Sequence, residues 1–114
     1  MSNKIIYKNK TLIRIFISEE DKLKGKPLYE QIVFEAKKLG LSGATVIRGI
    51  LGYGFTNEIH SAKFLALSEN LPIIIEIVEE EKNLKKIIRF LNENMKKGLV
   101  TLEKIKIMYI MDKN

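Results

Sequence analysis

Residue types that carry much of enzyme and metal chemistry are absent or rare in this sequence. There is no cysteine among its 114 residues, which excludes disulfides, thiol catalysis and thiolate metal sites. There is a single histidine, His60, and neither a serine–histidine–aspartate pattern nor a clustered pair of acids. We therefore expect that the protein is not an enzyme.

Long apolar segments are also missing. The longest apolar run, from Leu71 to Ile75, is interrupted by Pro72 and is far shorter than the ~20 residues that a membrane-spanning helix needs. The first residues, MSNKIIYKNK, contain lysines but not the apolar core of a secretory signal. Together these absences predict a cytoplasmic protein.

The overall composition is typical of one soluble domain, to which we assign residues 1–114. Apolar residues make up 46% of the sequence and charged residues 30%, as in folded globular proteins. The formal net charge of +6 suggests an anionic partner such as a nucleotide, a nucleic acid or an acidic lipid. However, the lysines are spread along the chain, which fits an ordinary solvated surface equally well.

The pattern of apolar residues predicts four strands and two helices. Strict alternation predicts a strand over Thr11 to Ser18, and a helix follows from Pro27 to a stop at Gly40. The remaining elements are a strand that begins at Thr45 and runs into three glycines, a strand over Leu71 to Glu79, a helix over Asn83 to Lys97 and a strand over Leu99 to Met111. Met1 to Lys10 is expected to be a frayed or edge segment.

This order predicts an α+β fold of the ferredoxin-like type. Two right-handed βαβ units interleave into a four-stranded antiparallel sheet with both helices on one face. The other face stays open, and by residue parity it carries apolar side chains together with charges of both signs. Such a patch usually marks an interface. We predict a homo-oligomer that buries Leu12, Arg14, Phe16, Arg48, Ile50, Ile74 and Glu76, with Arg14 paired to Glu76.

Several short motifs resemble a known family. They are Gly25-Lys26-Pro27-Leu28-Tyr29-Glu30, Gly43-Ala44-Thr45-Val46 with Arg48-Gly49, Leu71-Pro72 with Glu76-Ile77-Val78, and Gly98-Leu99-Val100-Thr101. As a set they resemble the uncharacterised PII-like proteins, a domain of unknown function that is distantly similar to the PII nitrogen-regulatory proteins. The resemblance implies a ferredoxin-like homotrimer whose sheets face the three-fold axis. It also implies a regulatory protein that signals to an unidentified protein or membrane transporter.

The same resemblance implies a nucleotide site. PII trimers bind adenine nucleotides in clefts between subunits, walled by the loop after the second strand and the loop before the fourth. By this resemblance AMP, ADP or ATP is the expected ligand, and the candidate residues are Gly49, Gly52, Tyr53, Gly54, Gly98, Leu99, Val100, Thr101 and Lys104. The clustered glycines could offer backbone N–H groups to a phosphate. Alternatively, they mark a bulged strand end without a ligand.

Two other functions fit parts of the sequence. The topology also serves RNA-binding modules, and Arg48 to Phe55 resembles their arginine-glycine-aromatic signature. That signature belongs on the third strand but lies here on the second, so nucleic acid is not the expected partner. A trimeric metal-responsive protein of the cation-tolerance type is the third possibility, supported only by His60 and Glu58. No metal site is assigned, and no cofactor is expected besides an adenine nucleotide as ligand.

Overall fold

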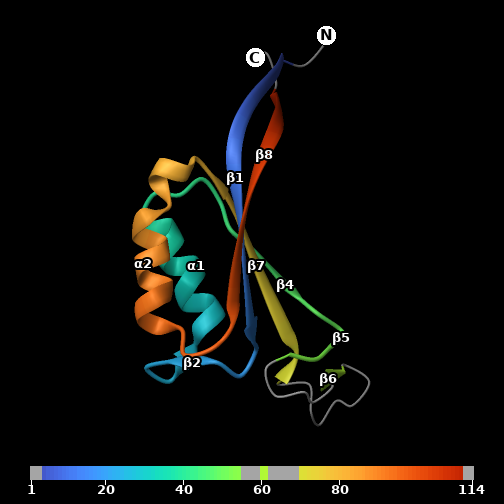
Figure 1. Cartoon of the computed structure of the whole chain (residues 1–114), viewed down its shortest axis with the longest axis vertical. Coiled ribbons are helices and arrows are strands. Elements are labelled where there is room, and N and C mark those ends of the chain that lie inside the picture. Colours follow the sequence, from blue (N-terminus) through green and yellow to red (C-terminus); the bar gives the residue numbers. More distant parts are fainter. Residues whose placement is uncertain (1–3, 55–59, 62–69, 112–114) are drawn as a thin grey trace.

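Two helices lie against one face of a four-stranded sheet (Figure 1). The structure is a computed structural model that describes residues 4–54, 60–61 and 70–111. The sheet strands are β1 (Lys4–Ser18), β4 (Thr45–Arg48), β7 (Pro72–Glu79) and β8 (Leu99–Met111), and the helices are α1 (Leu28–Lys38) and α2 (Lys85–Asn94). The shorter elements are β2 (Lys22–Leu23) paired with β3 (Lys26–Pro27), β5 (Leu51–Gly52) paired with β6 (His60–Ser61), and the 3-10 turn η2 (Glu81–Asn83).

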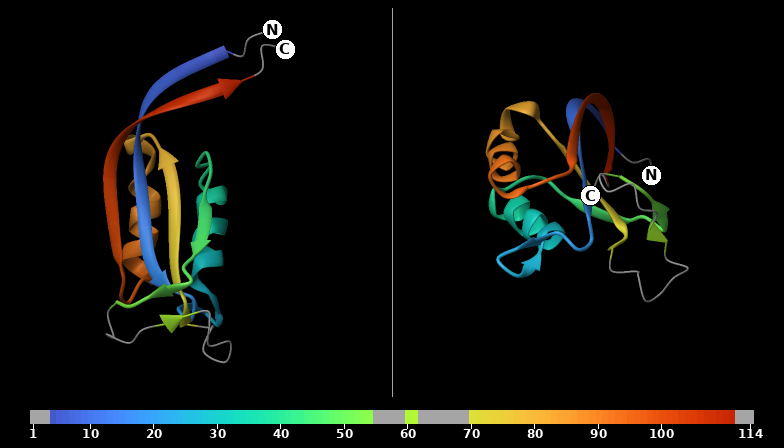
Figure 2. Two further views of the ribbon diagram at one scale, coloured as in Figure 1. Left: turned by 90° about the vertical axis from the view of Figure 1, so that its right-hand side faces the viewer. Right: turned by 60° about the horizontal axis from the view of Figure 1, so that its bottom comes forward.

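The topology confirms the predicted ferredoxin-like arrangement. The strand order is β4-β7-β1-β8, and every neighbouring pair is antiparallel. Both helices cover the same face, which the two views of Figure 2 show from the side and from the end. None of the helices in the described ranges is long and apolar enough to cross a bilayer.

The core lies between the helices and one face of the two central strands. In β1 and β7 the isoleucines alternate with half-buried residues, and each isoleucine on the helix side is buried. They meet a stripe of apolar side chains from the helical segments. The buried core residues are Ile13, Ile15, Ile17, Ile73, Ile75, Ile77, Leu28, Ile32, Ala36, Leu84, Ile87 and Leu91. This period-2 burial is what the alternation in the sequence predicted.

The open face carries the predicted ion pair. Arg14 and Glu76 are direct cross-strand partners, and the Arg14 Nε donates to Glu76 Oε2 at 2.8 Å. Glu103 on β8 approaches the same guanidinium at 3.5 Å. The hydrogen bond to Glu76, opposed by partial desolvation and helped by both carboxylate charges, raises the pKa of Arg14. The charges of this face therefore compensate one another, and Leu12, Phe16 and Ile74 supply its apolar surface.

The predicted parity of β4 is wrong. Val46 lies in register with Ile75 and Arg48 with Ile73, so both are on the helix side, while Thr45 and Ile47 are on the open face. Arg48 instead pairs with Glu19 at 2.7 Å. Ile50 lies between β4 and β5 and is 76% exposed. In a run of β-branched residues, polar and apolar side chains do not alternate. Only the register with β7 therefore decides which side chains face the helices.

Residues 4–10 form a longer regular strand than the expected frayed or edge segment. Lys4 to Lys10 extend β1 and pair with Ile105 to Met111 of β8, far beyond the end of β7. We call this two-stranded ribbon, residues 4–10 and 104–111, the arm. It projects past the body of the molecule, as Figures 1 and 2 show. The segment has no clean alternation of its own and becomes a strand because β8 supplies a long partner.

The second helix is shorter than predicted at its C-terminal end. It stops at Asn94, and Met95 already has extended backbone angles, φ −88° and ψ 128°. The last strand, by contrast, has the predicted bounds, Leu99 to Met111. Residues 95–98 thus form a turn that carries the chain from the helix layer back to the sheet edge.

Glu79 connects the end of β7 to the loop before β4. It is only 5% exposed, and its carboxylate accepts hydrogen bonds from the backbone N–H groups of Ser42 and Glu80, at 2.8 and 2.9 Å, and from the Asn83 side chain. Burial alone would raise the pKa of Glu79, but these hydrogen bonds outweigh it and lower the pKa below its ordinary value. The carboxylate is thus held ionised in the fold.

We predict that Glu79→Gln lowers the free energy of unfolding by about 1–3 kcal/mol at neutral pH. Because the folded pKa lies below that of the unfolded chain, ionised Glu79 stabilises fully above the unfolded value of about 4.5 and this contribution is lost as pH falls through the folded value. Urea denaturation at several pH values should therefore show that the free energy of unfolding of the variant depends less on pH in the acid range than that of wild type. Glu81→Gln, at an exposed neighbour, is the matched control; an equal effect of both changes would contradict the role of Glu79.

Candidate functional site

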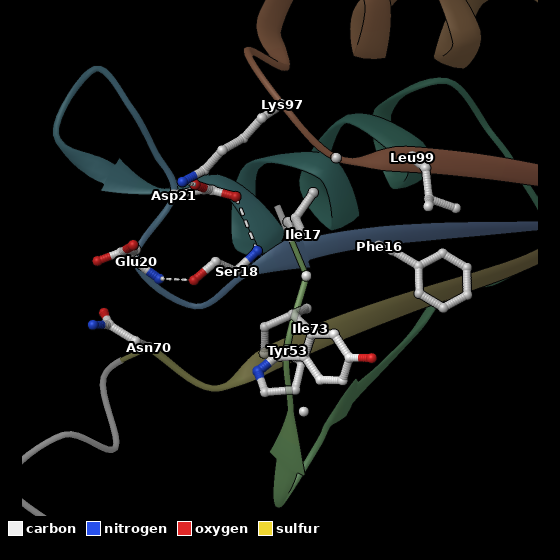
Figure 3. A pocket seen from close by; sticks show the side chains of 14 residues that line it. Phe16, Ile17, Ser18, Glu20, Asp21, Tyr53, Asn70, Ile73, Lys97 and Leu99 are labelled. Carbon is white, nitrogen blue, oxygen red and sulfur yellow. Dashed lines mark hydrogen bonds and ion pairs between the residues drawn. The ribbon is translucent and has the colours of Figure 1, made fainter. Parts of the chain in front are cut away.

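A pocket of about 210 Å³ lies at the end of the sheet where β1 ends and β7 and β8 begin (Figure 3). Its position follows from the topology, because β1 is antiparallel to both neighbours and Ser18 therefore meets Pro72 while Phe16 meets Leu99. The lining combines an apolar wall, a polar turn and glycine backbone. The lining residues are Phe16, Ile17, Pro72, Ile73 and Leu99; Ser18, Glu20, Asp21, Asn70 and Lys97; and Gly52, Tyr53, Gly54 and Gly98.

The glycine-rich segment after β4 folds closely against Pro72. The Gly49 N–H donates to the Pro72 carbonyl at 2.7 Å, and a Cβ at Gly49 would lie only 2.7 Å from the Pro72 ring. A Cβ at Gly52 would lie 3.0 Å from the same ring. Glycine is needed here because backbone and proline ring are in contact. This packing brings Tyr53 and Gly54 to the mouth of the pocket.

Gly98 forms the opposite wall. Its φ of +120° is a conformation that other residues rarely adopt, and a Cβ there would lie 2.6 Å from the Phe16 carbonyl oxygen. The turn after α2 can therefore approach the end of β1 only because residue 98 is glycine. It leaves Lys97 and Leu99 on the rim of the same pocket.

A turn after β1 supplies the polar side of the pocket. The Asp21 carboxylate accepts the Ser18 N–H at 2.9 Å, and its second oxygen lies 4.0 Å from the Lys97 Nζ. The Glu20 N–H points to the Ser18 hydroxyl at 3.4 Å. Figure 3 shows these groups around one side of the pocket, with Tyr53 and Phe16 on the other. Among the described residues, the lining thus contains two carboxylates and one cation.

Five of the predicted ligand residues line this one pocket. Gly52, Tyr53 and Gly54 come from the second strand's end, and Gly98 and Leu99 from the start of the last strand. The sequence interpretation placed these two walls on different subunits, whereas both lie on the pocket of one chain. Gly49 shapes the same region through its contact with Pro72.

The other predicted ligand residues lie elsewhere. Val100 is in register with Ile15 and faces the helices, while Thr101 is in register with Arg14 on the open face. Lys104 is in register with Thr11, at the other end of the sheet, beside Lys10 and Glu80. Because a strand rises ~3.4 Å per residue and alternates its faces, residues that follow Gly98 soon leave the pocket.

Sequence reasoning missed Ser18, Asp21, Pro72 and Lys97. The information to find them was present in the predicted topology, which already placed the end of the first strand beside the beginnings of the third and fourth. The metal hypothesis involved Glu58, which lies outside the described residues, as does the side chain of His60. Within the described ranges, no group of three or more His, Asp or Glu side chains could hold a metal ion.

We predict that Gly49→Ala destabilises the fold by about 1–3 kcal/mol, because the new methyl group overlaps the Pro72 ring. Gly54→Ala is the matched control in the same segment, since a Cβ there meets nothing within 4 Å. Thermal unfolding followed by circular dichroism measures both. Equal melting temperatures for the two variants would show that the close approach to Pro72 is not required.

The chain matches known proteins along nearly its whole length. Its residues 10–107 match the family model DUF190, described as "Uncharacterized ACR, COG1993". A UPF0166 protein from Aquifex aeolicus is 46% identical over 103 residues, covering 89% of this chain and 95% of that protein. A UPF0166 protein from Methanocaldococcus jannaschii is 38% identical over 92 residues, covering 80% and 84%.

Among solved structures, the chain resembles CPII, a nitrogen regulatory PII-like protein from Thiomonas intermedia, bound to ADP, AMP and bicarbonate. The TM-score is 0.63 at 13% identity, covering 90% of this chain and 96% of CPII. This likeness shows the fold, which is PII-like. The family match and the similar curated proteins agree with the resemblance seen in the sequence motifs, and the chain belongs to the DUF190 family.

Proposed function

We propose that this chain is a PII-like regulatory protein that binds an adenine nucleotide at the pocket between Tyr53 and Gly98. The observation that carries the proposal is the meeting of two glycine turns, one after β4 and one before β8, at a single concave site with an apolar wall. A PII-like protein of the same fold, CPII, has been solved with ADP and AMP, which supports a nucleotide as the class of ligand.

The base fits the pocket better than the phosphates do. Tyr53 is 72% exposed and can provide a face for stacking, which commonly contributes about 1–3 kcal/mol per base. The carboxylates of Glu20 and Asp21 are acceptors, and the exocyclic amine of adenine is a donor. Two carboxylates against one lysine, the charges of the described lining, would not attract a phosphate chain. We infer that the base enters and that the phosphates point outward.

The size of the pocket supports a site completed by a second copy. A volume of about 210 Å³ is below the roughly 300–1,000 Å³ usual for small-molecule sites, so a single chain encloses only part of a nucleotide. Cations for the phosphates would then come from a neighbouring subunit. This agrees with a trimer whose clefts lie between subunits.

The open sheet face is the proposed subunit interface. Leu12, Phe16 and Ile74 are apolar and half-buried in the single chain, and the Arg14–Glu76 pair beside them is already neutralised. The corrected register adds Thr45 and Ile47 to this face and removes Arg48. A face with internally paired charges and apolar neighbours can be buried without leaving an uncompensated charge.

Regulation would pass through the residues that follow the pocket. Tyr53 and Gly54 line the pocket and directly precede residues 55–59 in the sequence. Ligand-dependent ordering of a segment is an established way to switch docking. The receiver would be an unidentified protein or membrane transporter. The proposal is of binding and signalling, not of catalysis.

We predict that AMP, ADP or ATP raises the melting temperature of the chain in a thermal-shift assay. Tyr53→Ala should weaken binding about tenfold or more by calorimetry, because the stacking face is lost, while Tyr53→Phe should keep it. Phe34→Ala, at an exposed position on α1, is the control. No stabilisation by any of the three nucleotides would count decisively against the proposed ligand.

We predict that Ile74→Lys converts the oligomer to monomers, because it places a charge in the centre of the proposed interface. Sedimentation velocity measures the change, and circular dichroism checks that the monomer remains folded. A wild-type chain that already sediments as a monomer would contradict the interface.

A further inference from the structure

The arm exposes apolar side chains that the other described residues do not cover. Within the described ranges, residues 4–10 pair only with residues 105–111, and β7 ends its pairing at Thr11. Six large side chains of the arm are between 38 and 63% exposed: Ile5, Tyr7, Met108, Tyr109, Ile110 and Met111. Isolated two-stranded ribbons are marginal in water. A ribbon of this composition therefore needs something to cover it.

Both faces of the arm carry exposed apolar side chains. Ile5 pairs with Ile110 and Tyr7 with Met108, so these four side chains share one face. Tyr109 and Met111 lie on the other face, beside the half-buried Ile6. At roughly 200 Å² for a large side chain, the exposed fractions leave on the order of 600 Å² uncovered. A standard interface needs about 800 Å² per partner, so the arm alone supplies most of one side.

The arm also carries most of the net charge. It contains five lysines, Lys4, Lys8, Lys10, Lys104 and Lys106, and no acidic residue, in a chain whose net charge is +6. Lys10 pairs with Glu80 at 3.6 Å, and within the described residues no ion pair is formed by the other four. Arms of like charge would therefore repel one another.

We propose that the arm docks on a second copy of this chain. The exposed apolar area of the arm and its continuity with the open sheet face carry this choice of partner. The proposal rests on the oligomer of the proposed function and not on its ligand.

Continuity with the open sheet face supports this choice of partner. Ile6, Ile105, Ile107 and Tyr109 have the same parity as Leu12 and Phe16, so one row of side chains runs from the sheet face onto the arm. A copy seated on the open face would extend along the arm. A lipid surface would cover one face of the ribbon only and leave the apolar side chains of the other face exposed. Closed homo-oligomers are the commonest permanent assemblies.

The test is the double variant Tyr7→Lys, Ile110→Lys, which places two charges on one face of the arm. Sedimentation velocity over a range of concentrations should show association weakened about 100-fold relative to wild type. Phe34→Lys, at a residue 60% exposed on α1, is the matched control and should associate like wild type. Circular dichroism shows whether each variant keeps its secondary structure.

A spin label gives a second readout that does not depend on the charged variants. The chain has no cysteine, so Tyr7→Cys provides a single labelling site, with Phe34→Cys as its control. In the assembly the label at position 7 should be immobilised, and adding Ile74→Lys should release it. If the label is mobile while the oligomer is intact, or if the double variant associates like wild type, the arm proposal is wrong and the proposed oligomer stands. If wild type is a monomer, the proposed oligomer itself is wrong.

Binding assays with vesicles containing phosphatidylserine and with single-stranded RNA distinguish a membrane or a nucleic acid from a second copy as the partner of the arm. If the chain binds either of them, and Lys4→Gln, Lys8→Gln abolishes that binding while association is unchanged, the arm serves that ligand and the proposal is wrong. If Tyr7→Lys, Ile110→Lys weakens association and wild type binds neither ligand, the second copy is the partner.

Discussion

The pairing of β1 on both of its edges is the constraint on which the rest of the structure depends. Over Thr11 to Phe16 it is bonded to β7 on one side and β8 on the other, while its isoleucines form the floor of the core. A shift of one residue would move those isoleucines to the open face and Arg14 into the core. The register of β1 therefore sets the two faces of the sheet together with the Arg14–Glu76 pair.

The same constraint produces the site. Since β1 ends where β7 and β8 begin, the ends of three strands meet at one end of the sheet. Two glycines allow the connecting turns to pack there. Without a side chain, Gly49 can contact the Pro72 ring, and Gly98 can contact the Phe16 carbonyl at the end of β1. The shape of the pocket thus depends on close backbone contacts at Gly49 and Gly98.

The sequence predicted those features that depend on local pattern. Alternation identified β1, β7 and β8, and the glycines marked the two turns that meet at the pocket. The sequence pattern failed where strand pairing decides the structure. The β-branched run of β4 fits either face of the sheet, and only its register with β7 decides which side chains face the helices. Lys4 to Lys10 show no alternation, and they form a strand because they pair with β8. Lys104 was assigned to the site by proximity in sequence, although a few strand residues carry the chain well away from it. Asp21 and Lys97 were missed because the site was sought in motifs and not at strand ends.

The central place of β1 has a consequence for how the chain is made. Ile15 pairs with Ile75 and Val100, and Lys4 pairs with Met111, so every partner of the first strand is synthesised long after it. Pairs so distant in sequence form slowly, because closing the intervening loop must come first. During synthesis this isoleucine-rich strand therefore keeps two unpaired edges until almost the entire chain has been made, and exposed edges of this kind are prone to aggregation.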